Sequence, residues 1–103
     1  MEEKLKTQFE KEERQIDEIR AKIKKFQVIP GIGMSLAQDL IDLGYLEIEN
    51  LQGEDPNEMY QKLCSLRGQN IDRCVLYVFK CALYYVNNSI HEPELLKWWN
   101  WKD

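Results

Sequence analysis

The chain has 103 residues, a formal net charge of -4 and 44% hydrophobic residues, a composition typical of one small globular domain. The acidic balance argues against a strong nonspecific nucleic-acid binder, which carries a basic excess, but it leaves room for a local phosphate contact. The sequence has no apolar run long enough for a membrane span, and its N-terminal stretch MEEKLKTQFEKEER is too polar for a signal peptide, so we expect a cytoplasmic protein.

Residues 2–26 predict one long amphipathic helix, because this segment contains neither glycine nor proline. Its apolar residues recur at helical spacings of three, four and seven, and they are Leu5, Phe9, Ile16, Ile19, Ile23 and Phe26. We expect residues 1–15 to extend this helix beyond a globular domain formed by residues 16–103.

The extension predicts a partner. Written as heptads, the helix has an apolar seam that only Glu12 interrupts, and an exposed apolar stripe of this kind usually marks an interaction site. We predict a homodimer through residues 1–20, with Leu5, Phe9 and Ile16 in the seam. Folding of this helix back onto its own domain, or a solvated lone helix, are the alternatives.

The stretch VIPGIGMSLAQDLIDLGY predicts a tight turn followed by a second helix. Gly31 and Gly33 each allow a positive φ, and Ile32 between them is expected to pack inward. The second helix is predicted from residue 34 or 35 to residue 43. Gly44 then supplies a left-handed stop.

Three further helical segments follow. A short turn around Ile48 and Leu51 is expected to end at Gly53. The next helix opens with Asp55 as its N-cap, Pro56 at its first position and Glu58 completing a capping box. Its inner stripe and its stop are Met59, Leu63, Cys64, Leu66 and Gly68.

The next segment predicts a central buried helix. Asn70 is the expected cap, and residues 74–86 are almost wholly apolar. A buried strand is the competing interpretation, but about 17 unbroken residues favour a helix. A short final helix is opened by Pro93. The sequence therefore predicts an all-α bundle of five to six helices with a long N-terminal helix.

The PGIG turn, the helices beside it and the small Ala37 form a helix-hairpin-helix pattern. The first N–H groups of the second helix have no intrahelical partners and lie at the positive end of its dipole, so such a turn can bind a phosphate oxygen of DNA through main-chain amides. The predicted DNA-backbone-binding residues are Gly31, Ile32, Gly33, Ser35, Lys24, Lys25, Arg67 and Arg73. A purely structural turn is the alternative.

Four segments carry a family resemblance: PGIG…LAQDLIDLGY, LQGEDPNEMYQKLC, DRCVLYVFKCALYYV and PELLKWWNWKD. They resemble a small bacterial helix-hairpin-helix family labelled pathogenicity locus proteins, some named mitomycin-resistance proteins, and more broadly the C-terminal domain of the TfoX competence regulators. The resemblance spans residues 26–103 and implies a SAM-like, doubled helix-hairpin-helix fold, with residues 63–73 in the second hairpin.

The sequence departs from that pattern in two places. The second hairpin has the single glycine Gly68, and the first lacks the Lys or Arg that strong DNA binders carry just after the second glycine. Weak DNA affinity is therefore expected.

For the cysteines, the histidine and the tryptophans of the tail, we weigh packing roles against functional ones. Cys64, Cys74 and Cys81 lack the spacing of a zinc site and are expected to be buried thiols. His91 is expected at the surface. Among the tail residues, Trp98 and Trp101 are expected to pack with Leu95, which leaves Trp99 on another side. Either the tail simply closes the core, or Trp99 is an exposed aromatic that meets a protein partner.

Two functions therefore stay open, and both are noncatalytic. The first is a helix-hairpin-helix module that contacts the DNA backbone weakly and without sequence specificity. The second is a SAM-like protein-interaction module with no nucleic-acid role. We find no Ser/His/Asp order and no metal-ligand pattern, so we expect no enzymatic activity, no metal and no cofactor.

Overall fold

The computed structural model describes residues 2–103, with side chains from residue 14 onward. Four α-helices, α1 (Glu2–Phe26), α2 (Met34–Asp42), α3 (Pro56–Arg67) and α4 (Cys74–Asn87), are joined by three 3-10 helices, η1 (Ile48–Leu51), η2 (Pro93–Leu96) and η3 (Trp98–Trp101). The described residues contain no strand, so the predicted all-α class is confirmed and the strand alternative for the α4 segment was wrong. Within these residues no helix is both long and apolar enough to cross a membrane.

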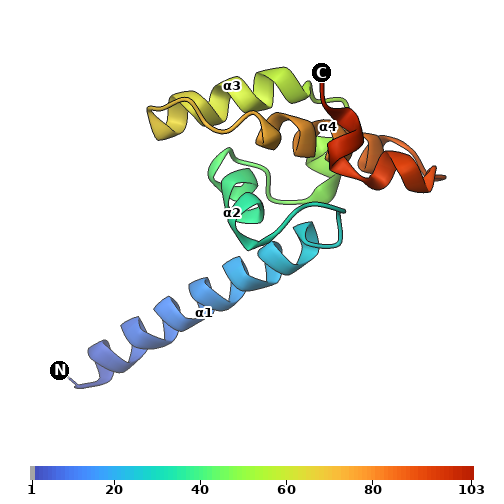
Figure 1. Ribbon diagram of the computed structural model, residues 1–103. Coiled ribbons are helices and arrows are strands. Elements are labelled where there is room, and N and C mark those ends of the chain that lie inside the picture. Colours follow the sequence, from blue (N-terminus) through green and yellow to red (C-terminus); the bar gives the residue numbers. More distant parts are fainter. Residues whose placement is uncertain (1) are drawn as a thin grey trace.

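The helices are arranged in two pairs. The C-terminal end of α1 packs on α2, α3 packs beside α4, and the C-terminal tail folds back over α4 (Figure 1). One core joins the two pairs. Its buried members are Phe26, Ile29, Ile32, Ala37, Leu40, Tyr45, Leu51, Met59, Leu63, Val78, Phe79, Ala82 and Leu83.

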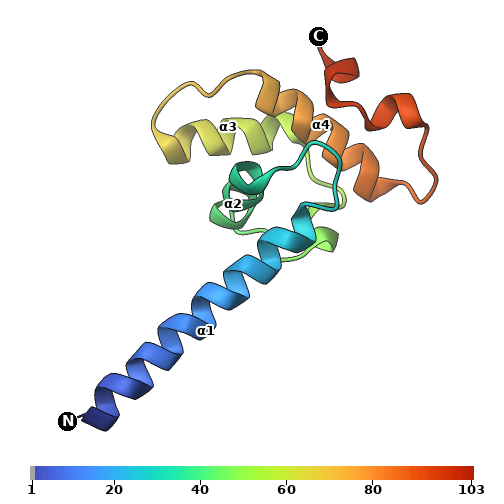
Figure 2. The same cartoon turned by 60° about the horizontal axis from the view of Figure 1, so that its bottom comes forward.

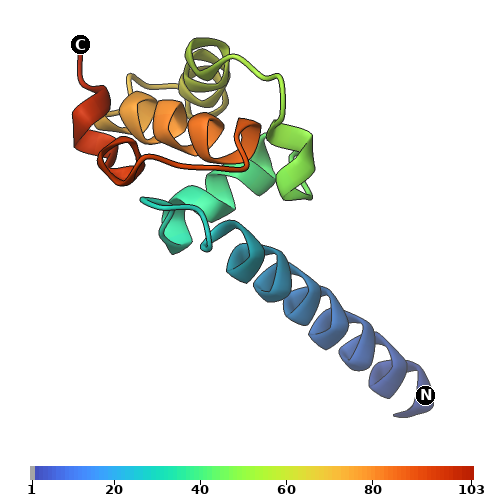
Figure 3. The same cartoon turned by 90° about the vertical axis from the view of Figure 1, so that its right-hand side faces the viewer.

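Most of α1 projects away from this core (Figures 2 and 3). The Cα radius of gyration is 16.4 Å and the chain measures 58 × 33 × 20 Å, whereas a compact chain of this length has a radius of gyration of about 13 Å. Among the side chains of α1 that the structure describes, Ile23 and Phe26 in its last turns are the ones that join the core. The predictions for Leu5 and Phe9 concern side chains that lie outside the described part of the structure.

The α1–α2 connection is built by short-range hydrogen bonds, from the Ile29 N–H to the Phe26 carbonyl and from the Ile32 N–H to the Ile29 carbonyl, each at 3.1 Å. Ile32 is buried between the helices and Ala37 is fully buried, as predicted. At the other end of α2, the Gly44 N–H donates to the Ile41 carbonyl and the Tyr45 N–H to the Leu40 carbonyl. With Gly44 at φ +99°, this is the Schellman arrangement that the glycine predicted.

Helix α3 begins where its sequence indicates, but its predicted cap is only half formed. The Asp55 carboxylate accepts the N–H groups of Asn57 and Glu58 at 2.8 and 3.4 Å. The return bond from the Glu58 side chain is absent among the described residues, and the complete capping box lies instead on η1, between Glu47 and Asn50.

The inner stripe of α3 was predicted one residue too long. Met59 and Leu63 are fully buried, and Gly68 ends the helix in a left-handed conformation. Leu66, however, is 51% exposed, because it lies in the last turn of α3 beside an open groove.

Helix α4 starts later than predicted. Asn70 was the wrong cap, because the Asp72 carboxylate accepts the Cys74 N–H at 2.8 Å and the Tyr60 hydroxyl donates to the Ile71 carbonyl. These bonds hold residues 69–73 as a loop. The helix that follows is central and buried, as expected, and its buried residues are Leu76, Val78, Phe79, Cys81, Ala82 and Leu83.

The tail forms two 3-10 helices where one helix was predicted. Lys97 stands between them with extended dihedral angles of φ -95° and ψ 112°, which breaks the helical path. The Trp101 indole Nε1 donates to the Leu95 carbonyl at 2.8 Å. Trp98 packs against the core, whereas Trp99 is 50% exposed, so the predicted division of the tryptophans is confirmed.

The burial of the three cysteines and of His91 agrees only in part with the prediction. Cys81 is buried, and its burial raises the pKa of the thiol. Cys64 and Cys74 are half-buried, although both were expected to be buried. His91 is not a free surface residue, since its ring stacks on Tyr85 at 4.8 Å and hydrogen-bonds the Tyr85 carbonyl at 2.8 Å.

The two hairpin glycines should respond differently to alanine. At Gly31, with φ +85°, a Cβ atom would lie 3.3 Å from Trp98 and 3.4 Å from Val78, so Gly31→Ala should lower the free energy of unfolding by about 1–3 kcal/mol. At Gly33 a Cβ atom meets nothing within 4 Å, and Gly33→Ala should change it by less than about 1 kcal/mol. Urea unfolding measures both, and equal losses would contradict this assignment.

Candidate nucleic-acid interface

The α1–α2 turn has one position that favours glycine, Gly31, and one that any residue could occupy, Gly33. Gly31 takes a positive φ of +85°, which only glycine adopts at low cost. Gly33, in contrast, has φ -87° and ψ -174°, an extended conformation open to any residue. The expectation that both glycines serve the chain reversal is therefore corrected. Gly33 is the N-cap of α2, and the space that a Cβ atom would occupy there has no neighbour within 4 Å.

The N-terminus of α2 presents a row of free backbone donors. The first intrahelical bond runs from the Ala37 N–H to the Gly33 carbonyl at 2.9 Å, so the N–H groups of residues 33–36 precede the helical ladder. None of these four has a hydrogen-bond acceptor among the described residues. Because Gly33, Met34 and Ser35 are exposed, these donors can be reached from solvent at the positive end of the helix dipole.

The opposite side of the same turn is closed by the rest of the molecule. Gly31 lies in close approach to Val78 of α4 and to Trp98 of the tail. The Lys102 ammonium lies 5.8 Å from the centre of the Trp98 ring, close enough for a cation–π interaction. Sequence reasoning missed this support, because a contact between residues so far apart in the chain leaves no local pattern.

The cations predicted to assist binding are mostly engaged with carboxylates. Lys25 lies 3.4 Å from Glu47 in an exposed pair, and Arg73 bonds Asp103. Arg67 contacts Asp39 and Asp42, which lie on α2, each at 2.6 Å. Lys24 is exposed and has no ion-pair partner within the described range. Ser35 thus lies on the first turn of α2 among the open amides, and Lys24 near the end of α1 stays available, while the two arginines hold other elements together.

The ion pairs shift the pKa values of their members. The hydrogen bond from Arg67, assisted by one from Gln38, lowers the pKa of Asp42. The bonds from Lys80 and then Arg73 lower the pKa of Asp103, and the bonds to Asp39 and Asp42 raise the pKa of Arg67. All these groups therefore stay charged at neutral pH, and the carboxylates neutralise the arginines.

The connection between α3 and α4 offers no comparable row of donors. Asp72 accepts the Cys74 N–H with its side chain and the Val75 N–H with its carbonyl, at 2.8 and 3.0 Å. The Leu76 N–H bonds the Arg73 carbonyl at 3.0 Å. The N-terminus of α4 is thus satisfied from within the chain and carries a carboxylate, which disfavours a phosphate there.

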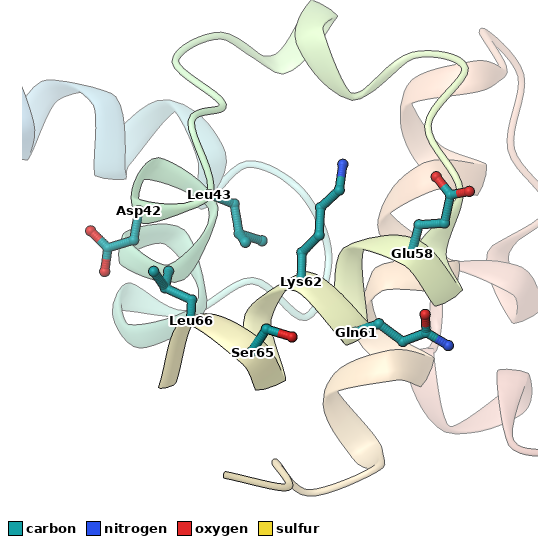
Figure 4. A pocket seen from close by; sticks show the side chains of 7 residues that line it. All are labelled: Asp42, Leu43, Glu58, Gln61, Lys62, Ser65 and Leu66. Atoms are coloured by element: carbon teal, nitrogen blue, oxygen red, sulfur yellow. The ribbon is translucent and has the colours of Figure 1, made fainter. Parts of the chain in front are cut away.

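A groove of about 650 Å³ lies between α2 and α3. Figure 4 shows Leu43 and Leu66 bordering it, with Lys62 extending across its α3 side. Its remaining lining residues are Asp42, Glu58, Gln61 and Ser65. Over the residues that the structure describes, no three His, Cys, Asp or Glu side chains gather closely enough to hold a metal ion.

Comparison with known proteins places this fold in a family. The family model described as pathogenicity locus matches residues 19–103. The chain belongs to the pathogenicity locus family. The match includes the hairpin, all of α2 to α4 and the tail, and it begins partway along α1. Residues 1–18 thus lie outside the part matched by the family model.

A curated relative carries a related name. A protein of Streptomyces lavendulae named mitomycin resistance protein McrB is 29% identical over 70 residues, which is 68% of this chain and 63% of the relative. The alignment therefore spans less than two thirds of that relative's length. No solved structure matches the chain, so the SAM-like, doubled helix-hairpin-helix arrangement stays a prediction.

Removing Arg67 should cost stability in a pH-dependent way. In the folded state the pKa of Asp42 is lowered from 3.8, so its ion pair contributes fully above that value and is lost as the pH falls through the lower folded pKa. Arg67→Gln should therefore be less stable than the native protein at neutral pH, with the difference shrinking as the pH falls below 3.8.

Urea unfolding at neutral and acid pH measures this effect. Lys62→Gln is the matched control, because it removes one cation from the same helix at an exposed site and should cause little change. Added salt should also reduce the Arg67→Gln effect, since the pair is partly exposed. A difference that is the same at both pH values would contradict the ion-pair assignment.

Proposed function

We propose that the α1–α2 hairpin is a noncatalytic module that binds the phosphate backbone of DNA weakly and without reading bases. The observation that carries this proposal is the row of N–H groups at residues 33–36. They have no acceptors among the described residues, and Gly33, Met34 and Ser35 are exposed. Amides held in this way at a helix N-terminus bind phosphate oxygens. Contacts to phosphates position a protein on a duplex but carry no sequence information.

The charges around the hairpin set the expected affinity. Arg67 and Arg73, predicted as phosphate ligands, are already paired with carboxylates, so we leave them out of the proposed interface. Lys24, Ser35 and the amides remain, in a chain with a net charge of -4. About two neutralised phosphates would give a log–log salt slope of about -2 and a weak, salt-sensitive complex.

A protein-interaction module is the second candidate, and the tail favours it. Trp99 is 50% exposed and meets Trp98 edge-on, with ring centres 5.8 Å apart. Because Trp98 itself lies against Gly31, this aromatic pair is joined to the hairpin turn. Exposed tryptophans are enriched among the residues that dominate protein–protein binding. The internal neutralisation of the arginines also fits a partner other than a polyanion.

Gly33→Asp should separate binding from folding. An aspartate at the N-cap can accept the free N–H groups of the first turn and places a negative charge at the positive end of the helix dipole. Stability should rise by a few tenths to about 1 kcal/mol, whereas DNA binding should be lost because a carboxylate occupies the donors. Fluorescence anisotropy with a short labelled duplex at low salt, together with a melting curve, measures both effects.

Ser65→Asp is the matched control for that experiment. It adds the same charge at an exposed position on α3, so it should weaken binding only slightly. Equal binding by Gly33→Asp and Ser65→Asp would rule out the amide site. Failure of the native protein to bind duplex or single-stranded DNA at low salt would reject the DNA proposal, and a protein complex lost in Trp99→Ala would support the second candidate.

A further inference from the structure

An apolar stripe runs along α1 and continues onto the start of α2. Ile16 and Ile19 are 49% and 41% exposed, and Met34 is 68% exposed. Ile16, Ile19 and Ile23 share one face of the helix through their spacings of three, four and seven. Ile23 and Met34 line one groove, together with Ser35, Gln38, Asp39 and Arg67. The stripe is therefore continuous from α1 into this groove.

The chain itself does not cover the stripe. In all three views α1 projects from the domain, and no other described segment lies beside it before its last turns (Figures 1, 2 and 3). The family match begins at residue 19, so the first part of the stripe lies outside the matched domain. An exposed apolar surface of this kind marks an interaction site.

The charges along α1 indicate what the occupant is. Residues 10–18 contain five acidic and two basic residues, whereas residues 19–25 contain four basic and no acidic ones. Asp17 and Arg20, one from each segment, are both exposed. Two copies of this helix in the same direction would place like charges together. Two copies in opposite directions would place the acidic segment of each beside the basic segment of the other.

We propose that a second copy of the chain covers the stripe, with the two α1 helices packed antiparallel about a two-fold axis near Ile16 and Ile19. Such an interface is self-complementary, because each copy offers the same surface. With Ile16 of one copy opposite Ile19 of the other, residues 9–12 of each copy reach the groove at Ile23 and Met34 of the other. The proposal is independent of DNA binding.

An apolar-to-charge change in the stripe tests the proposal. Ile19→Glu would bury a carboxylate in the dimer but leaves the free domain unaffected, since this side chain is exposed. Ile90→Glu is the matched control, because Ile90 is 87% exposed outside the stripe. Analytical ultracentrifugation over a micromolar concentration series should give dimers for the native protein and for Ile90→Glu, and monomers for Ile19→Glu with unchanged melting.

A charge exchange tests the direction of the helices. Glu13→Arg alone and Arg20→Glu alone each place like charges together in the antiparallel pair, because the register that sets Ile16 against Ile19 brings residue 13 of one copy beside residue 20 of the other, so both should shift the protein toward monomer. The double exchange restores opposite charges and should restore the dimer, with the effects reduced by salt. In a parallel pair none of the three variants would change the charge pairing in this way.

The remaining outcomes decide against the proposal. A native protein that stays monomeric throughout the series would overturn it, and so would an Ile19→Glu variant that keeps the dimer mass. If the single charge variants dimerise as well as the native protein, the antiparallel arrangement is wrong. If Ile19 becomes shielded from solvent only when another protein is present, the stripe binds that protein and the proposal of a second copy is wrong.

Discussion

The close approach of the hairpin turn to α4 and the tail is the constraint on which the rest of the structure depends. At Gly31 the backbone passes so near Val78 and Trp98 that even one extra carbon atom would be in tight contact. This approach fixes the turn between the two helix pairs. It buries Ile29 and Ile32 on one side and directs the first amides of α2 to the other. The exposed donors are therefore a consequence of how the turn is packed.

The ion pairs link separate elements of the fold and neutralise several of its surface cations. Arg67 of α3 joins the two carboxylates of α2, and Arg73 with Lys80 of α4 holds the terminal Asp103. Each pair ties together elements from different parts of the chain, so the same cations that a sequence offers for phosphate binding serve to hold the fold. An exposed pair contributes little on its own, but these contacts remove positive charge from the region of the hairpins.

Helix α1 has two different environments along its length. Its last turns belong to the core, where Phe26 is fully buried, and residues 14–21 before them are exposed. The boundary of the family match falls near this change. A core residue such as Phe26 constrains the sequence through packing, whereas the exposed stripe is free to vary until a partner covers it. The end of α1 that the family model matches and the extension before it thus lie in different physical environments.

The sequence by itself determined the helices and most of their ends, because those depend on interactions within a few residues. The glycine stop after α2, the Asp55 cap of α3 and the burial of α4 follow from local pattern. The start of α4 was missed because Asp72, rather than Asn70, supplies the accepting carboxylate. The tail was predicted as one helix but forms two 3-10 helices, because Lys97 between them adopts an extended conformation.

Only the tertiary structure decided what the candidate site contains. Arg67 meets Asp39 across 28 residues of sequence and Arg73 meets Asp103 across 30, so neither engagement leaves a local signal. The same holds for Trp98 at Gly31. Spacing along a chain fixes which side chains share a helix face, but the partner of a long charged side chain is chosen by the packing of helices against one another. That packing removed two arginines from the predicted interface and left the amides of α2 open.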